Sequence, residues 1–452
     1  MQLIESLEPR LDAGALALPG TPEYERTCTL YSTTHQDRPQ VVVRCRSEKD
    51  VIAAVRTAAE HGVTISPRGG GHNATGRALC DGIVLDFSEF RTVTVDPKRR
   101  LAQARPGATW SDYDTATQQY GLASPGGVIS STGVAGLTLG GGIGALRGLY
   151  GFACDNLNSV DIVLADGSLR TVNAVREPDL FWALHGGSGN FGVIVGFEFN
   201  VHPVTHMVSG ILGFPLEDAT SVLTRYAERA DELPDDCTTE IMFVRDPAPG
   251  STRKLLLIIP RFAGHIAEAE SAIGLLRSLG TPVIDEIQEF TYLESQCFLD
   301  AMTPWGNRHH MRSQTLTGIT EDVVAVLERV VREAPSFLSQ IVLEDFHGAI
   351  TRVAPDATPI GFRHARFNVM ITAQWEDAAD DEKNVRWTLD TREALAPFSA
   401  GGGYVNYMPR ESTPDDLRQA YGDANFRRLQ EVKAAYDPEN LFRSNINIPP
   451  AQ

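Results

Sequence analysis

Short runs of β-branched and aliphatic residues alternate with helical segments along the first 200 residues of the chain. Segment 50–60 places Val51, Ala54, Val55 and Ala58 on one face of an amphipathic helix, because residues three and four apart share a face. Segment 160–174 has two β-branched runs around an Asp-Gly pair, which predicts a β-hairpin. The pattern also predicts strands at 41–45, 64–68, 82–88, 92–97, 101–107 and 193–201, and a short helix at 178–185.

A different pattern extends from about residue 204 to residue 409. Longer apolar strands (KLLLIIPRF, QIVLEDFHG and FNVMITAQW) alternate there with the helical segments SAIGLLRSL and VVAVLERVVREA. This α+β pattern is typical of an antiparallel sheet flanked by helices. Beyond it, apolar residues recur at helical spacing from Leu417 to Tyr436, and Asp437-Pro438 ends that predicted helix.

Glycine is concentrated in three segments, 66–76, 121–144 and 186–192. Glycine lets backbone approach a ligand closely, and clustered backbone amides suit a pyrophosphate. Three such loops favour one extended ligand over three unrelated tight turns. His72 directly follows three glycines, and four roles are open to it: metal ligand, general base, buried structural imidazole, or attachment point.

Two of these loops contain the G-x-G-x-x-G/A fingerprint of dinucleotide sites, at 140–145 and 187–192. The second follows a predicted helix and precedes a strand, which reverses the order that the dinucleotide fold requires. The first lies inside a glycine-rich segment without a clear strand, turn and helix. An NAD(P)-dependent dehydrogenase therefore remains only an alternative.

Composition narrows the class of protein further. The formal charge is −18, and no basic cluster offers a surface for nucleic acid. The first nine residues hold two acids and no base, and no apolar run is long enough for a membrane span, so a cytoplasmic protein is expected. The six cysteines are widely separated, which predicts free thiols rather than a zinc site or a disulfide framework.

Five motifs in order, RGGGHNATG, GGGIGALRGLYGFACDNL, GGSGNFGVIVGF, YVNY and AAYDPENLFRSNINIPP, resemble those of the berberine-bridge-enzyme-like FAD-linked oxidases. These enzymes belong to the vanillyl-alcohol-oxidase superfamily, and the ending FRSNINIPP is most similar to bacterial members of the 6-hydroxy-D-nicotine oxidase type. The resemblance implies an α+β protein with a two-lobed PCMH-type FAD-binding domain at 1–203. A substrate domain at 204–409 and a C-terminal segment at 410–452 that returns to the FAD domain complete the expected organisation.

The resemblance also implies a site. His72 would carry FAD through a covalent bond to the C8 methyl group of the flavin, loop 67–73 would hold the pyrophosphate, and the flavin ring would lie near Gly192-Val193 and Asn445–Asn447. The expected cofactor contacts besides His72 are Arg68, Gly69, Gly70, Gly71, Asn73, Ser131, Thr132, Gly133, Gly136, Thr138, Gly141, Gly142, Gly192, Val193, Asn445 and Asn447.

Two departures from the family pattern matter. Many relatives have a second flavin bond from a cysteine, but Ile129 stands at that position, so a single covalent link is expected. Cys154 lies in a different motif and is expected to be a buried free thiol. Some relatives have an aromatic residue after the triple glycine, where this chain has Ile143.

Candidate catalytic groups lie in two segments. In sugar- and alcohol-oxidising relatives the last tyrosine of the YVNY motif is the base, which implies Tyr407 here, although a tyrosine packed at an interface is the alternative. In segment 341–348, alternation places Asp345 and His347 on one strand face, and the resemblance implies that Asp345 assists Tyr407. The adjacent His309 and His310 point to opposite faces of an extended chain, so we expect no shared metal.

These observations predict an FAD-dependent oxidase that oxidises a C–OH or C–N bond of a small molecule and passes electrons to O₂ to give H₂O₂. One alternative is a flavin-dependent tailoring enzyme of secondary metabolism, in which hydride removal triggers ring closure or a redox rearrangement. A flavin-free binding protein that keeps the fold is a further alternative.

Overall fold

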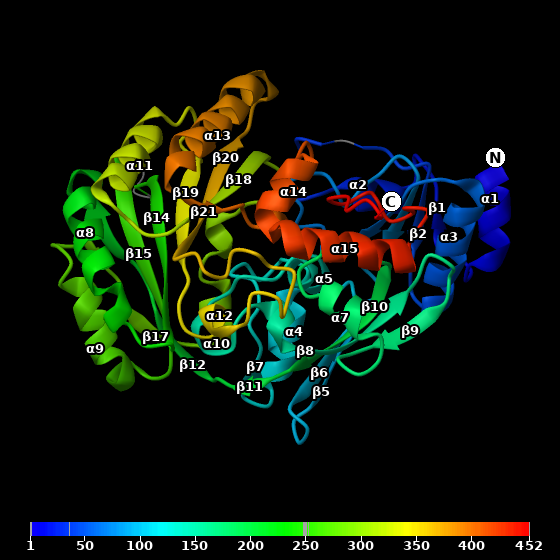
Figure 1. Ribbon diagram of the computed structural model, residues 1–452, viewed down its shortest axis with the longest axis horizontal. Coiled ribbons are helices and arrows are strands. Elements are labelled where there is room, and N and C mark those ends of the chain that lie inside the picture. The colour runs from blue at the N-terminus through cyan, green and yellow to red at the C-terminus, as the bar shows by residue number, and fades with distance from the viewer. Residues whose placement is uncertain (1, 36, 247–250, 252, 452) are drawn as a thin grey trace.

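A computed structural model describes residues 2–35, 37–246, 251 and 253–451, which form two lobes side by side (Figure 1). The N-terminal lobe begins with a four-stranded sheet in the order β1-β2-β4-β3. Strands β2 and β3 each pair in parallel with β4, which requires a crossover, and helix α3 (Glu48–His61) provides it. The elements of this part are α1 (Gln2–Leu7), β1 (Leu16–Ala17), α2 (Pro22–Cys28), β2 (Val41–Arg44), β3 (Ile65–Arg68) and β4 (Ile83–Asp86).

The second sheet of this lobe has five antiparallel strands in the order β5-β6-β10-β8-β9. The predicted hairpin at 160–174 is confirmed, because β8 and β9 pair across its turn. The strands are β5 (Val93–Asp96), β6 (Leu101–Ala104), β8 (Leu157–Val163), β9 (Leu169–Val172) and β10 (Val193–Asn200), with the short pair β7 (Leu122–Ala123) and β11 (His202–Pro203). The helices are α4 (Trp110–Gln118), α5 (Val134–Leu139), α6 (Arg147–Tyr150) and α7 (Pro178–Ala183).

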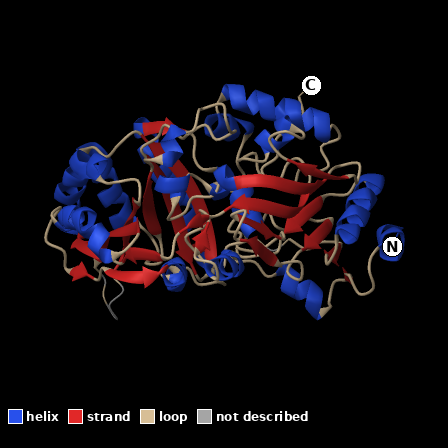
Figure 2. Cartoon of the chain, turned by 90° about the horizontal axis from the view of Figure 1, so that it is seen from below, coloured by secondary structure: helices blue, strands red, loops and turns tan. Residues whose placement is uncertain are grey.

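The other lobe is built on a ten-stranded sheet in which every pair is antiparallel. Its strands are β12 (His206–Ser209), β13 (Leu212–Pro215), β14 (Cys237–Arg245), β15 (Lys254–Ala263), β16 (Ile284–Asp285), β17 (Gln288–Thr291), β18 (Arg308–Leu316), β19 (Gln340–Asp345), β20 (Phe367–Trp375) and β21 (Ser399–Gly401). Its helices are α8 (Ala219–Arg229), α9 (Ile266–Arg277), α10 (Tyr292–Cys297), α11 (Glu321–Glu333), α12 (Ala349–Arg352) and α13 (Asp381–Leu395). The predicted α+β fold is confirmed, with strands in the middle of the molecule and helices around them (Figure 2).

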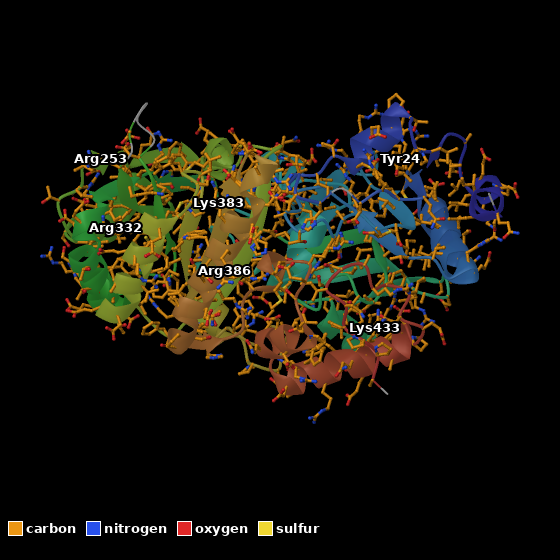
Figure 3. All side chains as sticks on the ribbon, turned by 90° about the horizontal axis from the view of Figure 1, so that it is seen from above. Tyr24, Arg253, Arg332, Lys383, Arg386 and Lys433 are labelled. Carbon is orange, nitrogen blue, oxygen red and sulfur yellow. The ribbon has the colours of Figure 1, made fainter. Side chains whose placement is uncertain are left out.

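The two faces of this large sheet differ in what they contact. Ile341 and Leu343 of β19 share a core with apolar residues of helices α8, α9, α11 and α13, whose outer sides carry exposed residues such as Arg332 and Arg386 (Figure 3). The opposite face carries Val342, which packs with Ile129 of the N-terminal lobe. We call this opposite face the inner face. Strand alternation therefore sends every second side chain towards the other lobe.

The C-terminal segment returns to the N-terminal lobe, where α15 packs against α7 (Figure 1). The single predicted helix is in fact two, α14 (Pro414–Tyr421) and α15 (Asp423–Tyr436), because Gly422 between them has φ +77°, which breaks the helix. Lys433, labelled in Figure 3, is fully buried; its Nζ donates to Asp437 Oδ2 at 2.6 Å and to the backbone oxygens of Asn190 and Phe442. The domain boundaries at residues 203 and 409 stay predictions.

All six cysteines are free, as expected. Within the described ranges, the helices lack the combination of length and apolarity that crossing a membrane demands.

Candidate active site

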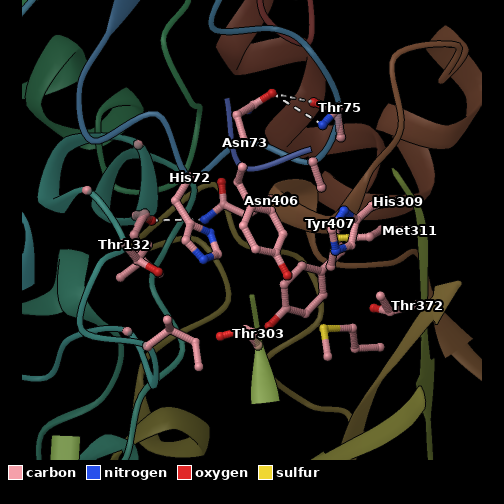
Figure 4. Close-up of a pocket in the computed structure, with 18 of the residues that line it drawn as sticks. His72, Asn73, Thr75, Thr132, Thr303, His309, Met311, Thr372, Asn406 and Tyr407 are labelled. Carbon is pink, nitrogen blue, oxygen red and sulfur yellow. Dashed lines mark hydrogen bonds between the residues drawn. The ribbon is translucent and has the colours of Figure 1, made fainter. Parts of the chain in front are cut away.

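A cavity lies between the glycine loops of the N-terminal lobe and the inner face of the large sheet. Figure 4 views it with His72 and Thr132 on one side and Met311 and Thr372 on the other. The expected cofactor residues that line it are Gly69, Gly70, Gly71, His72, Asn73, Thr132, Gly133, Gly136 and Asn445. Segments far apart in the sequence thus form one wall.

Two glycine positions in this wall have different surroundings. A Cβ atom on Gly70 would lie 2.8 Å from Gly133 Cα, so the first two glycine loops touch backbone to backbone. A Cβ atom on Gly136 would meet nothing within 4 Å and would project into open space beside the cavity. One glycine pair therefore closes the loops on each other, and Gly136 leaves room for a ligand.

His72 lies in an aromatic cluster on this wall. Its ring stacks on Tyr31 with 4.1 Å between centroids, and Tyr31 also contacts His309, at 4.4 Å, and the edge of Trp305. Burial lowers the pKa of His72 to about 4, so the imidazole is neutral at pH 7. His72 Nε2 is buried without a hydrogen-bond partner among the described residues. Most buried polar atoms in folded proteins are paired, and one that is not calls for an explanation such as a bound ligand, an ordered water or strain.

Metal binding by His72 gains no support. Among the described residues, the group of side chains that is placed to hold a metal ion is His206, His265 and Glu289, outside the cavity wall. The two adjacent histidines of β18 diverge as expected: His309 lines the cavity, whereas His310 Nε2 lies 3.0 Å from Glu411 Oε1 and its Nδ1 faces Thr388.

Some expected cofactor residues lie outside the cavity wall: Arg68, Ser131, Thr138, Gly141, Gly142, Gly192, Val193 and Asn447. Arg68 instead forms an ion pair with Asp86. Gly192 and Val193 are packed inside the lobe, because a Cβ atom on Gly192 would lie 2.7 Å from Ile162 and Val193 belongs to a buried core; the expectation that the flavin ring lies near them stays a prediction.

Ser188 and Gly189 line the cavity in place of Gly192 and Val193. They belong to the glycine loop that the sequence indicated, at the end opposite to the expected Gly192 and Val193. The nicotinamide fingerprints also lack their context: 140–145 follows helix α5 rather than a strand, and 187–192 lies between α7 and β10.

The two positions that depart from the family pattern lie at the same cavity. Ile129 and Ile143 both line the cavity. Cys154 is fully buried outside it, and burial raises the pKa of its thiol well above the ordinary value. A second flavin bond from Cys154 is therefore not supported by the geometry.

Tyr407 belongs to a 3-10 turn (Val405–Tyr407) rather than to the extended segment that we predicted. Tyr404 fixes this turn against the second glycine segment, because its hydroxyl accepts a hydrogen bond from the Gly142 N–H at 2.8 Å. Asn406 does the same by donating to the Leu137 carbonyl at 3.0 Å. Tyr407 is thereby directed into the cavity (Figure 4), where its O–H donates to Glu344 Oε1 at 2.9 Å.

The expectation that Asp345 assists Tyr407 is wrong by one residue. Strand alternation sends Glu344 to the inner face and Asp345 to the helical side. There Asp345 Oδ2 lies 2.7 Å from His347 Nδ1, and Asp345 Oδ1 lies 3.2 Å from Arg366 Nε. Neither Asp345 nor His347 lines the cavity. The signal for Glu344 was present as the acid beside Asp345, but the sequence does not show which strand face meets the site.

Glu344 is the hydrogen-bond acceptor of the pair. The residue is 3% exposed, and burial raises its pKa to about 7, although Asn368 Nδ2 donates to Oε2 at 2.6 Å. Burial and the Glu344 charge raise the pKa of Tyr407 well above its ordinary value, so the phenol keeps its proton. The pair is therefore suited to pass a proton from a bound molecule through the phenol to the carboxylate.

Comparison with known proteins identifies the class. Residues 39–173 match the family described as FAD binding domain, and residues 403–449 match the family described as berberine and berberine like. The chain is 30% identical to the (R)-6-hydroxynicotine oxidase of Paenarthrobacter nicotinovorans over 455 residues, 97% of each chain. It is also 30% identical, over 97% of each chain, to the FAD-linked oxidoreductase YgaK of Bacillus subtilis (strain 168). The chain therefore belongs to the berberine-bridge-enzyme-like FAD-linked oxidoreductases.

Solved structures agree with this assignment. The 6-hydroxy-D-nicotine oxidase from Arthrobacter nicotinovorans superposes with a TM-score of 0.88 at 27% identity over 98% of this chain and 99% of that one. A xylooligosaccharide oxidase from Myceliophthora thermophila C1 has the same fold, with a TM-score of 0.89 at 23% identity and full coverage of both chains. The chain is thus an FAD-linked enzyme, and the nicotinamide alternative is discarded.

The cavity fits FAD. Gly136 leaves open space, the touching loops at Gly70 and Gly133 present backbone amides, and His72 offers an unpartnered nitrogen. Asn73 and Asn445 add amide groups to the same wall. These groups would hold the cofactor along the N-terminal lobe, which leaves the inner face of the large sheet for a substrate.

Proposed function

We propose that this protein is an oxidase whose FAD is bound covalently, through His72 alone, and which oxidises a C–OH or C–N bond of a small molecule with O₂ as electron acceptor. The single observation that carries the proposal is the buried, unpartnered Nε2 of His72 in the wall of a glycine-lined cavity. FAD, when bound, supplies the hydride acceptor and passes the electrons to O₂, which gives H₂O₂.

A neutral imidazole is the form needed for the bond to the flavin, because its ring nitrogen keeps a free lone pair. Burial supplies this form by lowering the pKa of His72 to about 4. Tyr31 supports the orientation, since the stacked rings are only 12° from parallel. Ile129 has no nucleophilic atom at the position of the second bond, which supports a single link.

In this proposal, side chains of the protein accept the proton of the substrate O–H or N–H. Tyr407 would donate to Glu344 while it accepts the substrate proton, so the phenol changes partners without becoming a free phenolate. This arrangement supports oxidation at a carbon that bears an ionisable O–H or N–H. In this proposal Glu344, rather than Asp345, assists Tyr407.

Acid precipitation tests the covalent bond. The denatured wild-type protein should keep its yellow colour, and mass analysis should find the FAD mass on the peptide that contains His72. His72→Ala should make the flavin dissociable and slow its reduction by substrate. His310→Ala removes a histidine that lies next to His309 on β18 and faces away from the cavity, and this variant should keep the covalent flavin. Colour that washes out of the wild-type precipitate would refute covalent attachment.

A further inference from the structure

Two histidines and a glutamate gather at one edge of the large sheet, where Figure 1 labels β12, β17 and α9. His206 begins β12, His265 directly precedes α9, and Glu289 lies in β17. Each side chain offers one nitrogen or oxygen atom, and these three atoms all lie within 4.8 Å of one another. None of the three residues lines the cavity with Tyr407 and Glu344, so the cluster is separate from the proposed oxidase chemistry.

Backbone pairing brings the three residues together. Strand β12 pairs with β15 on one side and with β17 on the other, and Val208 lies opposite Glu289. His206 is two residues from Val208, so its side chain is on the same sheet face as that of Glu289. Val208 belongs to the core under the helices, which identifies this face as the one away from the cavity. The Gly264 N–H donates to the His206 carbonyl at 3.0 Å, which holds the start of α9 beside β12.

Neighbouring groups orient the three side chains. The Ile266 N–H donates to Glu289 Oε2 at 2.8 Å, and the other oxygen, Oε1, faces His265 Nδ1, also at 2.8 Å. The Thr205 hydroxyl lies 2.9 Å from His206 Nδ1, and the two imidazole rings are 4.3 Å apart between centroids. Such outer contacts are the ones that orient histidine and carboxylate ligands around a metal ion.

The distances and the ligand types suit a cation such as Zn²⁺. Zinc lies about 2.0–2.2 Å from imidazole nitrogens and carboxylate oxygens, so the ligand atoms of a tetrahedral site are about 3.3 Å apart. The 2.8 Å gap between His265 Nδ1 and Glu289 Oε1 has to widen only slightly to admit the ion. Imidazole favours zinc and its transition-metal neighbours, whereas Mg²⁺ and Ca²⁺ prefer oxygen ligands. Three protein ligands leave the fourth zinc position to water.

The charges around the cluster balance in favour of a cation. The N-terminus of α9 carries a partial positive charge, which opposes binding. Two carboxylates offset it, because Glu289 accepts from the Ile266 N–H and Glu268 Oε2 accepts from the His265 N–H at 2.8 Å. The His265 side chain is 56% exposed, so an ion can reach it from solvent. The hydrogen bond from Glu289 raises the pKa of His265, so a proton competes with the ion for this nitrogen.

We propose that His206, His265 and Glu289 form a binding site for one divalent cation of the zinc type. The bound ion joins three segments: the start of β12, which follows directly from β11 of the N-terminal lobe, the start of α9, and β17. Strand β17 runs into α10, and α10 packs against α4 of the N-terminal lobe. The ion therefore stabilises the sheet edge next to the junction of the lobes, and it takes no part in the flavin chemistry.

Calorimetric titration of the untagged holoenzyme with Zn²⁺ tests the site, at about pH 8 so that protons compete less with the ion. One Zn²⁺ should bind tightly per chain and raise the melting temperature, because it binds the folded protein. Mg²⁺ should not compete. His206→Ala, His265→Ala and Glu289→Gln should each weaken Zn²⁺ binding by about 10–100-fold and remove most of the rise in melting temperature. His364→Ala, which removes another exposed histidine, should bind Zn²⁺ as the wild type does.

Three results would overturn this inference: no Zn²⁺ binding to the wild type, the same Zn²⁺ affinity in the three cluster variants, or equally tight binding of Mg²⁺. Binding without a rise in melting temperature would refute the stabilising role of the ion. The cluster variants should keep the FAD content of the wild type, because the cluster lies outside the cavity. Loss of FAD together with loss of Zn²⁺ binding would contradict the separation of the two sites.

Discussion

The proton acceptor next to Tyr407 yields the most direct prediction. Raising the pKa of Glu344 from its ordinary 4.5 to about 7 corresponds to about 3 kcal/mol against the ionised form. A base acts only when deprotonated, so flavin reduction should become faster as pH rises through 7. At pH 6 about a tenth of the molecules would carry the carboxylate, and the rate should be about a tenth of its plateau.

The substitutions Glu344→Gln and Tyr407→Phe should each slow flavin reduction by about 10²–10⁴-fold. Glu344→Gln should also remove the pH dependence near 7. Because the two groups act as one unit through their 2.9 Å hydrogen bond, the double variant should be little slower than either single variant. Stopped-flow reduction without O₂, at several pH values, measures all four proteins.

Asp345→Asn is the matched control, since that carboxylate lies one residue away on the helical side of the sheet. It should keep the wild-type pH profile. A wild-type rate that is flat between pH 6 and 8 would refute the role of Glu344. A double variant whose fold loss of reduction rate equals the product of the two single losses would also refute it.

Two further substitutions test the cofactor cradle and the contact between the lobes. Gly136→Leu should lower the FAD content per chain while the protein stays folded, and full FAD in this variant would disprove the cradle. The control is Gly274→Ala, at an open helical glycine outside the cavity. This control should keep its FAD and gain up to about 1 kcal/mol of stability. Arg147→Met removes a fully buried partner of Glu240 and should lower the free energy of unfolding in urea by about 3–5 kcal/mol. Arg352→Met, which breaks an exposed ion pair, should change it little, and equal effects would contradict the burial argument.

Much of the fold could be predicted from local patterns. Helix α3 buries the face that its spacing indicates, and β2, β3 and β4 lie within the predicted strands, because side-chain periodicity reports which face is buried. The break at Gly422 was missed, since apolar spacing continues through it. The turn of Tyr407 was also missed, because contacts of Tyr404 and Asn406 with the other lobe fix it.

The sequence by itself determined the glycine loops, the position of His72 beside them and the alternation along β19. It could not determine which face of β19 meets the cavity, because alternation defines two faces and only the packing of helices against one of them selects the other. Tertiary structure therefore replaced Asp345 with Glu344 as the partner of Tyr407. It also decided the pKa values of His72 and Glu344, since both shifts come from burial by segments distant in the chain.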